Sequence, residues 1–349
     1  MLWCLLGIVA GILFGIIPGA GPFLAIATLY SLLASGDVVS IITFYVCLLI
    51  TSNYMNSITG ILYGIPGDAA AAVTAHHGHK LLREGKGHMA VSNNAISSSI
   101  GSLFAVGLFI ILLPNIYSVF KFYNSTIQVA IIAIAILLLM LFSKQAIWKT
   151  IILFLLGAVL AKIGFDNLTH KTWGTFGIDY LTLGIPFSAI MIGLYIVPEV
   201  LKFQHIEFKP IQKITKFGYS FKSLPSTLTG SFIGFWCGLV PGVTNILGSY
   251  LSASFAKQDI NKIAASESAN NSGALSSLLP LIVLGIPIVS SEVLIYYLVA
   301  SKGFTFNIDS MNSFYNVLYY IPVTVIICLL LSWIDFNYLA AITSLYKKY

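Results

Sequence analysis

Long apolar stretches alternate with short polar segments along the whole chain. Stretches of about 20 apolar residues predict transmembrane helices, because that length spans the hydrocarbon core of a bilayer. An alternating apolar and polar pattern typical of strands is absent. Simple spans are predicted at 92–113, 126–142, 146–164, 181–200 and 313–334.

Four further apolar stretches are interrupted by glycine and proline. Proline removes a backbone donor and glycine permits unusual dihedral angles, so each interruption breaks a straight helix. Together with the simple spans, these stretches predict an all-α polytopic membrane protein with about nine or ten membrane segments. The interrupted stretches are 1–17 with 20–35, 38–67, 226–256 and 273–301.

The composition excludes a soluble globular enzyme. Of the 349 residues, 58% are hydrophobic and only 9% are charged, whereas a soluble domain carries about 25% charged residues. The formal net charge of +6 comes from lysines and arginines that mostly lie between apolar segments. Basic residues in such loops set the orientation of a membrane protein and do not indicate nucleic-acid binding.

The basic segments predict which side of the membrane each loop faces. Segments 80–88, 143–149 and 202–222 are rich in Lys and Arg, and two simple spans separate each successive pair. All three therefore lie on one side, which the positive-inside rule makes cytoplasmic. The C-terminal Lys347 and Lys348 return to the same side.

Two glycine and proline motifs recur in the same order. The first pair is spaced by 223 residues and the second by 221. An odd number of crossings, five, separates the two copies, so they enter the membrane from opposite faces. This predicts two inverted repeats, typical of secondary transporters. The motifs are Gly11-x-x-x-Gly15-x-x-Pro18-Gly19 with Gly234-x-x-x-Gly238-x-x-Pro241-Gly242, and Gly64-Ile65-Pro66 with Gly285-Ile286-Pro287.

The repeats divide one integral membrane domain, 1–349, into parts. Residues 7–113 form the first repeat core and 226–303 the second. Residues 126–200 are connecting helices, and 304–349 are the terminal helix and tail.

Polar side chains precede both Gly-Ile-Pro breaks and mark the candidate site. Backbone groups freed at such breaks are tolerated only where they face protein or a water-filled cavity. Helix N-termini there attract anions, and amides and hydroxyls can coordinate a carboxylate or a small cation. The candidate substrate- and ion-binding residues are Pro18, Gly19, Gly21, Ser52, Asn53, Asn56, Ser57, Thr59, Gly64, Pro66, Pro241, Gly242, Thr244, Asn245, Glu267, Asn270, Asn271, Gly285, Pro287 and Glu292.

The two glutamates of this set each have two interpretations. A carboxylate in lipid is costly and needs a function or a partner. Glu267 is either a site residue or an interfacial helix cap near Lys257 and Lys262. Glu292 is either a proton or cation ligand or a buried residue satisfied by a neighbouring serine.

The histidines favour a solvated cytoplasmic loop over a metal site. His76, His77, His79 and His88 lie in a basic segment without a nearby thiolate. No nucleophile elbow, phosphate-binding loop or metalloprotease motif is present, so an enzyme is not expected. No metal or resident cofactor is expected beyond a coupling sodium ion or proton.

Four blocks, in order, resemble the large permease subunit of the tripartite tricarboxylate transporters, the TctA-like family. The likeness covers about residues 7–303. Tyr54-Met55-Asn56-Ser57 departs from the usual family stretch, and the chain resembles a shortened and divergent member. The blocks are Gly11–Pro22; Gly64–Asp68 with Thr74–Gly78 and Gly85–Ala90; Gly164–Thr169 with Thr175–Gly177 and Gly193–Val200; and Gly238–Gly242 with Ala265–Asn271 and Leu284–Pro287.

The resemblance implies uptake of small organic anions, di- or tricarboxylates, coupled to a sodium or proton gradient. It also implies a bacterial-type inner membrane, a small membrane subunit and a periplasmic solute-binding protein. The alternatives are a permease or channel for another small solute, and a non-transporting membrane scaffold. The oligomeric state is not predicted.

Overall fold

The computed structural model describes residues 1–17, 19–120, 146–166, 171–185, 218–240, 244–306 and 311–332, with isolated positions at 126, 129, 130 and 133. The chain divides into two compact units. The first combines Met1–Gln128 with His205–Tyr349, and the second is Val129–Gln204. The second unit covers most of the range expected for connecting helices.

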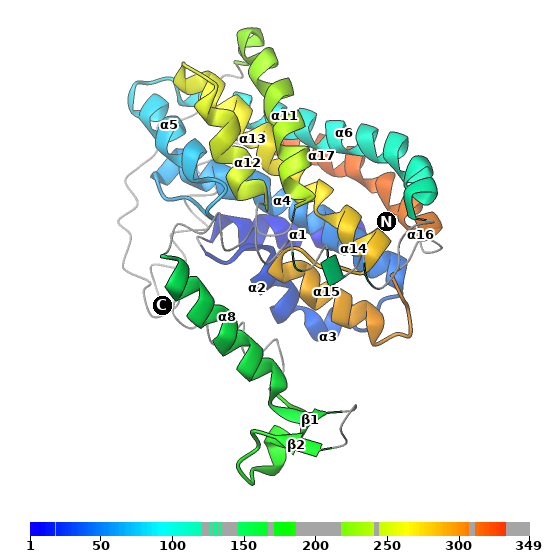
Figure 1. Cartoon of the computed structure of the whole chain (residues 1–349). Helices are drawn as coiled ribbons and strands as arrows, with labels where there is room; N and C mark the ends of the chain where they lie inside the picture. The colour runs from blue at the N-terminus through cyan, green and yellow to red at the C-terminus, as the bar shows by residue number, and fades with distance from the viewer. Residues whose placement is uncertain are drawn as a thin grey trace. The chain divides into compact units, whose positions relative to one another are not determined.

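The described part of the first unit is built from helices (Figure 1). The first half of the chain contributes α1 (Leu2–Ile16), α2 (Gly21–Thr28), α3 (Tyr30–Leu33), α4 (Val38–Tyr63), α5 (Ala72–Arg83) and α6 (Gly87–Phe120). The second half contributes the short 3-10 helix η3 (Phe221–Ser223), α11 (Leu224–Gly238), α12 (Thr244–Ser254), α13 (Asp259–Ser276), α14 (Leu278–Leu284), α15 (Ser290–Ala300), α16 (Met311–Leu318) and α17 (Tyr320–Leu331).

Three stretches of helix in the described part of the chain are long and apolar enough to cross a membrane. They are Val38–Tyr63, Gly87–Leu113 and Phe314–Leu331, and Leu2–Ile16 and Ser290–Ala300 are shorter apolar helices. The all-α polytopic membrane fold is therefore confirmed. The total of nine or ten segments stays a prediction, because the ranges 126–142 and 181–200 lie largely outside the described residues.

Helices α4 and α13 form the centre of the first unit. Residues Ile41–Leu62 of α4 and Ile263–Ser276 of α13 are buried throughout. Helix α13 packs against α4, α5, α6, α11 and α12 (Figure 1). Since both helices carry many polar side chains, the centre of the unit is a polar interior enclosed by apolar helices.

Glycines bring one helix against each central helix in the same way. A Cβ atom added to any of these glycines would press against the central helix, so the backbones can approach only because the side chains are absent. The matched contacts are Gly7, Gly11 and Gly15 of α1 with the carbonyl oxygens of Phe44, Leu48 and Ser52 on α4, and Gly230, Gly234 and Gly238 of α11 with those of Ala265, Ala269 and Gly273 on α13.

These contacts keep the spacings of the sequence motifs. The glycines are offset by 223 residues and their partner residues by 221, as in the Pro-Gly and Gly-Ile-Pro motifs. Helix pairs α1–α4 and α11–α13 are thus built alike. The opposite orientation of the repeats stays a prediction.

Both Gly-Ile-Pro motifs terminate a helix with a left-handed glycine. Gly64 has φ 73° and Gly285 has φ 66°. The N–H of Gly64 donates to Gly60 O and that of Gly285 donates to Leu281 O, each at 2.9 Å. A residue with a side chain is strained at such dihedrals, which explains the glycine in both motifs.

The second unit contains α8 (Ile147–Lys162), strands β1 (Gly164–Asp166) and β2 (Lys171–Trp173), and the 3-10 helix η1 (Asp179–Leu183). The strands pair antiparallel, with Gly164 opposite Trp173. Helix α8 lies within a predicted span and exposes apolar side chains around most of its surface. A helix that is apolar on all sides suits a lipid environment.

Candidate transport site

Glu267 of α13 lies in the polar interior, and its side chain is completely buried. The hydroxyl of Ser57 on α4 donates to its Oε1 atom at 2.7 Å. The hydroxyl of Ser98 on α6 lies 3.2 Å from its Oε2 atom. Glu267 therefore connects the second repeat with two helices of the first, and it does not cap a helix at the interface.

An amide side chain lies one helical turn from each of these three residues. Asn53 precedes Ser57, Asn94 precedes Ser98, and Asn271 follows Glu267. Asn94 Oδ1 lies 3.3 Å from the Ser98 hydroxyl. Asn271 Nδ2 donates to the main-chain oxygen of Glu267 at 3.0 Å.

Several amide atoms of this group have no hydrogen-bond partner within the described residues. They are Asn53 Nδ2, Asn94 Nδ2 and Asn271 Oδ1, and all three are buried. Buried polar atoms in proteins are almost always hydrogen-bonded to protein or to ordered water. We call the region around Glu267, Ser57 and Ser98 with these three amides the Glu267 chamber; its free polar atoms can receive a polar ligand or water.

The sequence analysis missed the contribution of α6, because it treated 92–113 as a simple span. Seven of the eleven residues from 92 to 102 are Ser or Asn. That density of polar residues in an apolar helix was the available signal, since such residues face the protein interior. The buried ones are Ser92, Asn93, Asn94, Ser97, Ser98, Ser99 and Ser102.

The first helix break brings several predicted residues together. Gly19 N–H donates to Gly67 O at 2.8 Å, so the turn after α1 meets the loop after α4. Asn56 Nδ2 donates to Asp68 Oδ2 at 3.1 Å, and the N–H of Ala71 donates to Asp68 Oδ1 at 2.8 Å. Asp68, which was not among the candidates, closes this break by accepting the free donors.

The second break is closed by Glu292. Its Oε1 accepts from the Ser277 hydroxyl at 2.6 Å, and its Oε2 accepts from the N–H groups of Ile288 at 2.7 Å and Val289 at 3.2 Å. Glu292 is fully buried and contributes no free oxygen of the kind found in the chamber. These contacts favour the structural interpretation of Glu292.

The remaining candidates lie around these two regions. Asn245 Nδ2 donates to Asn270 Oδ1 at 2.6 Å between α12 and α13. Thr244 has a positive φ of 54° at the start of α12. Ser52 is buried on α4 with an unpartnered hydroxyl, and Thr59 donates to a main-chain oxygen of its own helix.

Three candidates lie outside the described residues, and four others belong to the turns and breaks themselves. Pro18, Pro241 and Gly242 are outside. Gly21 opens α2 with φ 50°, and Pro66, Gly285 and Pro287 lie in the breaks that end α4 and α14.

The predicted histidine loop is wrong, because residues 72–83 form helix α5. Small residues on one face of α5 pack on the end of α4: Ala75 lies against Gly60, and Gly78 lies against Ile61. This packing stabilises the helix and places the basic residues on its other face.

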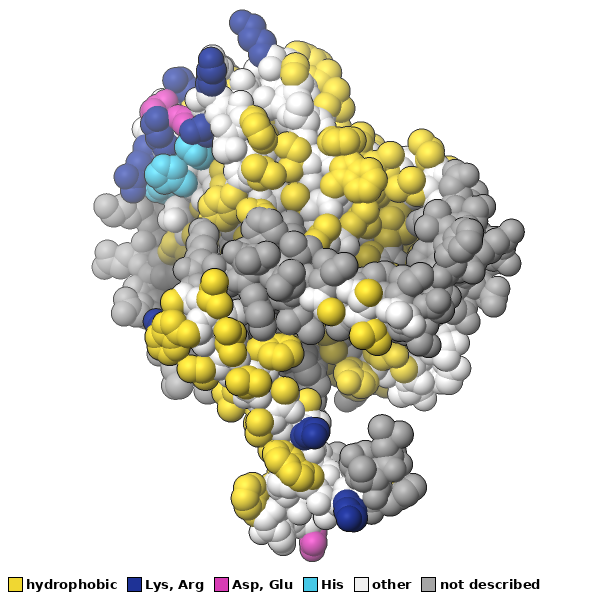
Figure 2. Space-filling view, in the orientation of Figure 1, with side chains coloured by type: hydrophobic (Ala, Val, Ile, Leu, Met, Phe, Trp, Pro, Cys, Tyr) yellow, Lys and Arg dark blue, Asp and Glu magenta, His cyan; other side chains and the backbone are white. Residues whose placement is uncertain are grey.

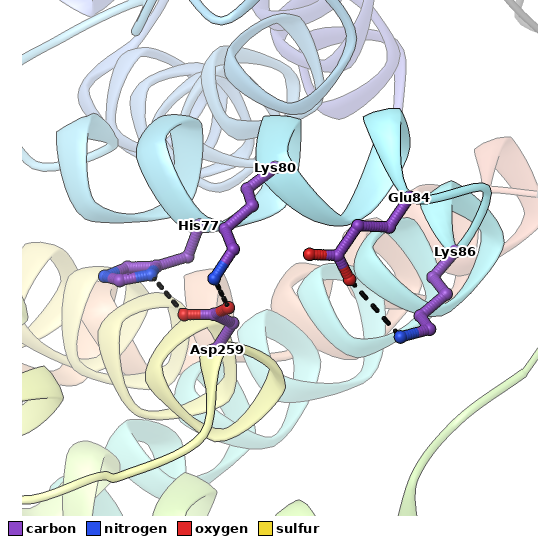
Figure 3. Close-up of polar contacts among 5 residues, drawn as sticks. All are labelled: His77, Lys80, Glu84, Lys86 and Asp259. Atoms are coloured by element: carbon purple, nitrogen blue, oxygen red, sulfur yellow. Dashed lines mark hydrogen bonds and ion pairs between the residues drawn. The ribbon is translucent and has the colours of Figure 1, made fainter.

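An ion-paired cluster links α5 with the start of α13 (Figure 3). His77 Nδ1 lies 2.7 Å from Asp259 Oδ1, and Lys80 Nζ donates to Asp259 Oδ2 at 2.7 Å. The hydrogen bond from Lys80 lowers the pKa of Asp259. Burial lowers the pKa of His77, although Asp259 acts in the opposite direction.

The charged side chains of the first unit gather over α5 and the adjoining helix ends (Figure 2). Ser223 donates to Asn261 at 2.8 Å and so brings η3, with Lys222, to the start of α13. Apolar side chains are exposed over α11 and α12, including Phe232, Trp236 and Leu251. The unit thus has a basic end next to an apolar belt.

The profile of the Tripartite tricarboxylate transporter TctA family matches residues 1–349. The chain belongs to this family. The resemblance carried by the glycine, proline and Glu/Asn blocks is therefore confirmed, and the protein is an integral membrane protein of a transporter family.

Two curated relatives of this TctA-family chain are themselves uncharacterized. An uncharacterized 52.8 kDa protein from the TAR-I ttuC' 3' region of Agrobacterium vitis is 28% identical over 331 residues, which cover 90% of this chain and 66% of the relative. An uncharacterized protein of Methanocaldococcus jannaschii is 27% identical over 294 residues, covering 82% of this chain and 70% of the relative. The chain spans about two thirds of the length of these relatives. No solved structure matches it.

Proposed function

We propose that the protein is a secondary-active permease that takes up small organic anions, di- or tricarboxylates. Membership of the TctA family supports this class of solute. The observation that carries the proposal is Glu267, a buried carboxylate surrounded by hydroxyls and by amides with unpartnered atoms. A wholly structural role would not require this many free polar atoms in a membrane core.

The Glu267 chamber suits a site that is shared by two moving parts. Glu267 belongs to the second repeat, whereas Ser57 and Ser98 belong to the first. If the repeats move relative to one another, these contacts break and re-form, which changes the affinity for the solute. In this mechanism the paired helix breaks provide alternating access.

A sodium ion or proton at Glu267 would couple uptake to a gradient. A carboxylate with neighbouring hydroxyl and amide oxygens offers ligands for a small hard cation, and a carboxylate alone accepts a proton. Neutralising Glu267 also removes the repulsion that it would exert on an anionic substrate.

The basic end of the first unit supports a cytoplasmic position for α5 and the starts of α11 and α13. We infer that the protein lies in a bacterial-type inner membrane. A periplasmic solute-binding protein would deliver the anion, and a small membrane subunit would assist. These partners follow from the family and not from a surface of this chain.

Uptake by purified protein in proteoliposomes tests the proposal. With an imposed sodium or proton gradient, radiolabelled citrate, succinate and tartrate should accumulate in vesicles that contain the protein. Glu267→Gln keeps the side-chain volume but removes the charge, and it should reduce uptake by about 100-fold, as expected when a buried charged ligand is lost.

Glu84→Gln is the matched control, because Glu84 is an exposed carboxylate that pairs only with Lys86. It should transport like the wild type. No gradient-driven uptake of any of the anions by folded wild-type protein would contradict the proposal. Solute flux that ignores both gradients would instead indicate a channel.

A further inference from the structure

A groove of about 380 Å³ lies between α5 and helices α12 and α13. Its wall on α5 includes His76 and His77, and its opposite wall includes Tyr250, Ser254 and Lys262. The two walls belong to different repeats. No carboxylate is among the residues that line the groove.

The ammonium group of Lys262 is the main reason to expect an anion here. Its side chain is half-buried, yet it makes no hydrogen bond or ion pair with any residue that the structure describes. A partly buried charge without a partner is unfavourable, because it loses hydration and gains nothing in return. An anionic ligand would supply the missing partner.

The nearest carboxylate cannot serve as that partner. Both oxygens of Asp259 are occupied, one by His77 and the other by Lys80. The Asp259 contact also holds the His77 ring in position on the wall of the groove. His76 contacts His77 edge to face, with ring centroids 4.8 Å apart, and makes no other printed contact.

We propose that this groove binds an oxyanion, with Lys262 as the main charged contact and the imidazoles of His76 and His77 beside it. Carboxylate and phosphate share the required chemistry, a compact anion whose oxygens accept hydrogen bonds. The ligand is either a soluble oxyanion or the phosphate of an anionic lipid headgroup at the basic end of the protein. The groove is separate from the Glu267 chamber.

Calorimetric titration of the full chain in phosphatidylcholine nanodiscs tests the site. Inorganic phosphate and succinate are titrated at constant ionic strength. Lys262→Met removes the charge and keeps the length of the side chain, and it should weaken binding at least about tenfold. Lys262→Arg should retain binding. Lys257→Met is the matched control, since Lys257 is exposed, lies five residues away and does not line the groove.

A second series identifies the source of the oxyanion. Nanodiscs that contain phosphatidylglycerol should weaken phosphate binding to the wild type if the lipid headgroup occupies the groove, and leave it unchanged if the ligand is soluble. Either result supports the proposal when Lys262→Met removes the effect or the binding.

Two results would overturn it. One is equal weakening by Lys262→Met and Lys257→Met, which indicates unspecific attraction to a basic surface. The other is wild-type protein that binds neither anion in phosphatidylcholine and retains phosphatidylglycerol no better than Lys262→Met. Because these experiments measure binding without a gradient, failure of transport would not affect them.

Discussion

The two halves of the membrane core end their central helices alike but place their polar residues differently. Each break has a left-handed glycine, and each is closed by a carboxylate that accepts backbone N–H groups. The side-chain donors to the two carboxylates, Asn56 and Ser277, are themselves 221 residues apart. The breaks are therefore equivalent in construction.

The polar chemistry does not follow this equivalence. On α4 the polar run lies just before the break, whereas α14 in the same position is apolar. The polar residues of the second half lie earlier, on α13, and Glu267 corresponds to Val46 in the first half. Helix packing is repeated, but the Glu267 chamber has a single carboxylate.

This difference indicates that the two repeats share a scaffold and divide the site chemistry between them. Glycine contacts and helix caps preserve backbone geometry, so both halves need them. One buried charge requires only one set of partners, and a second carboxylate at position 46 would repel the first.

The largest effect on stability is expected from removing the carboxylates that close the breaks. Glu292→Ala leaves two backbone N–H groups and the Ser277 hydroxyl without their acceptor, and it should cost about 3 kcal/mol or more. Asp68→Ala affects one backbone N–H and Asn56 at a half-buried position, and it should cost about 1–2 kcal/mol. Unfolding in detergent micelles measures both.

Equal costs for the two substitutions would show that the breaks are equivalent in energy as well as in construction. Glu84→Ala, at an exposed position, is the control and should change the unfolding free energy by less than about 0.5 kcal/mol.

The glycine contacts should respond alike in the two repeats. Gly11→Ala and Gly234→Ala each add a methyl group against the backbone of a central helix. Each should destabilise the protein by about 1–3 kcal/mol, the usual cost of overpacking. Gly107→Ala is the control, because nothing lies within 4 Å of its added Cβ. A clear difference between the first two substitutions would show that one repeat tolerates helix separation better.

The smallest effect concerns the contact between the repeats at the basic end. Because Lys80 lowers the pKa of Asp259 in the folded protein, Asp259 stabilises the fold above its unfolded pKa of about 3.9. That contribution is lost as the pH falls through the folded pKa. Asp259→Asn should cost about 0.2–1 kcal/mol at pH 7 and progressively less below about pH 4.

His77 titrates in a separate range and can be removed from the comparison. Burial lowers its pKa, so its protonation disfavours the fold as the pH falls below about 6.5. Thermal unfolding of Asp259→Asn in a His77→Gln background, from pH 7 to pH 4, therefore isolates Asp259. A difference that grows toward low pH would contradict the assigned interaction.

Much of the scaffold could be predicted from the sequence, because glycine and proline act locally. Gly64 and Gly285 end their helices as expected, since no other residue accepts these dihedrals easily. The loop predicted at His76–His79 is a helix instead, because its stability comes from packing of Ala75 and Gly78 on α4. That contact is invisible in a local pattern of histidines and lysines.

The sequence by itself determined the solvent, the helical class and the repeated breaks, since hydrophobicity and backbone restrictions are properties of neighbouring residues. Tertiary structure decided which polar residues meet. Ser57, Ser98 and Glu267 lie far apart in the chain, and only the packing of α4, α6 and α13 joins them around one carboxylate. Packing likewise made Glu292 a helix cap and left Lys262 without a partner, because burial and hydrogen bonding depend on contacts between distant segments.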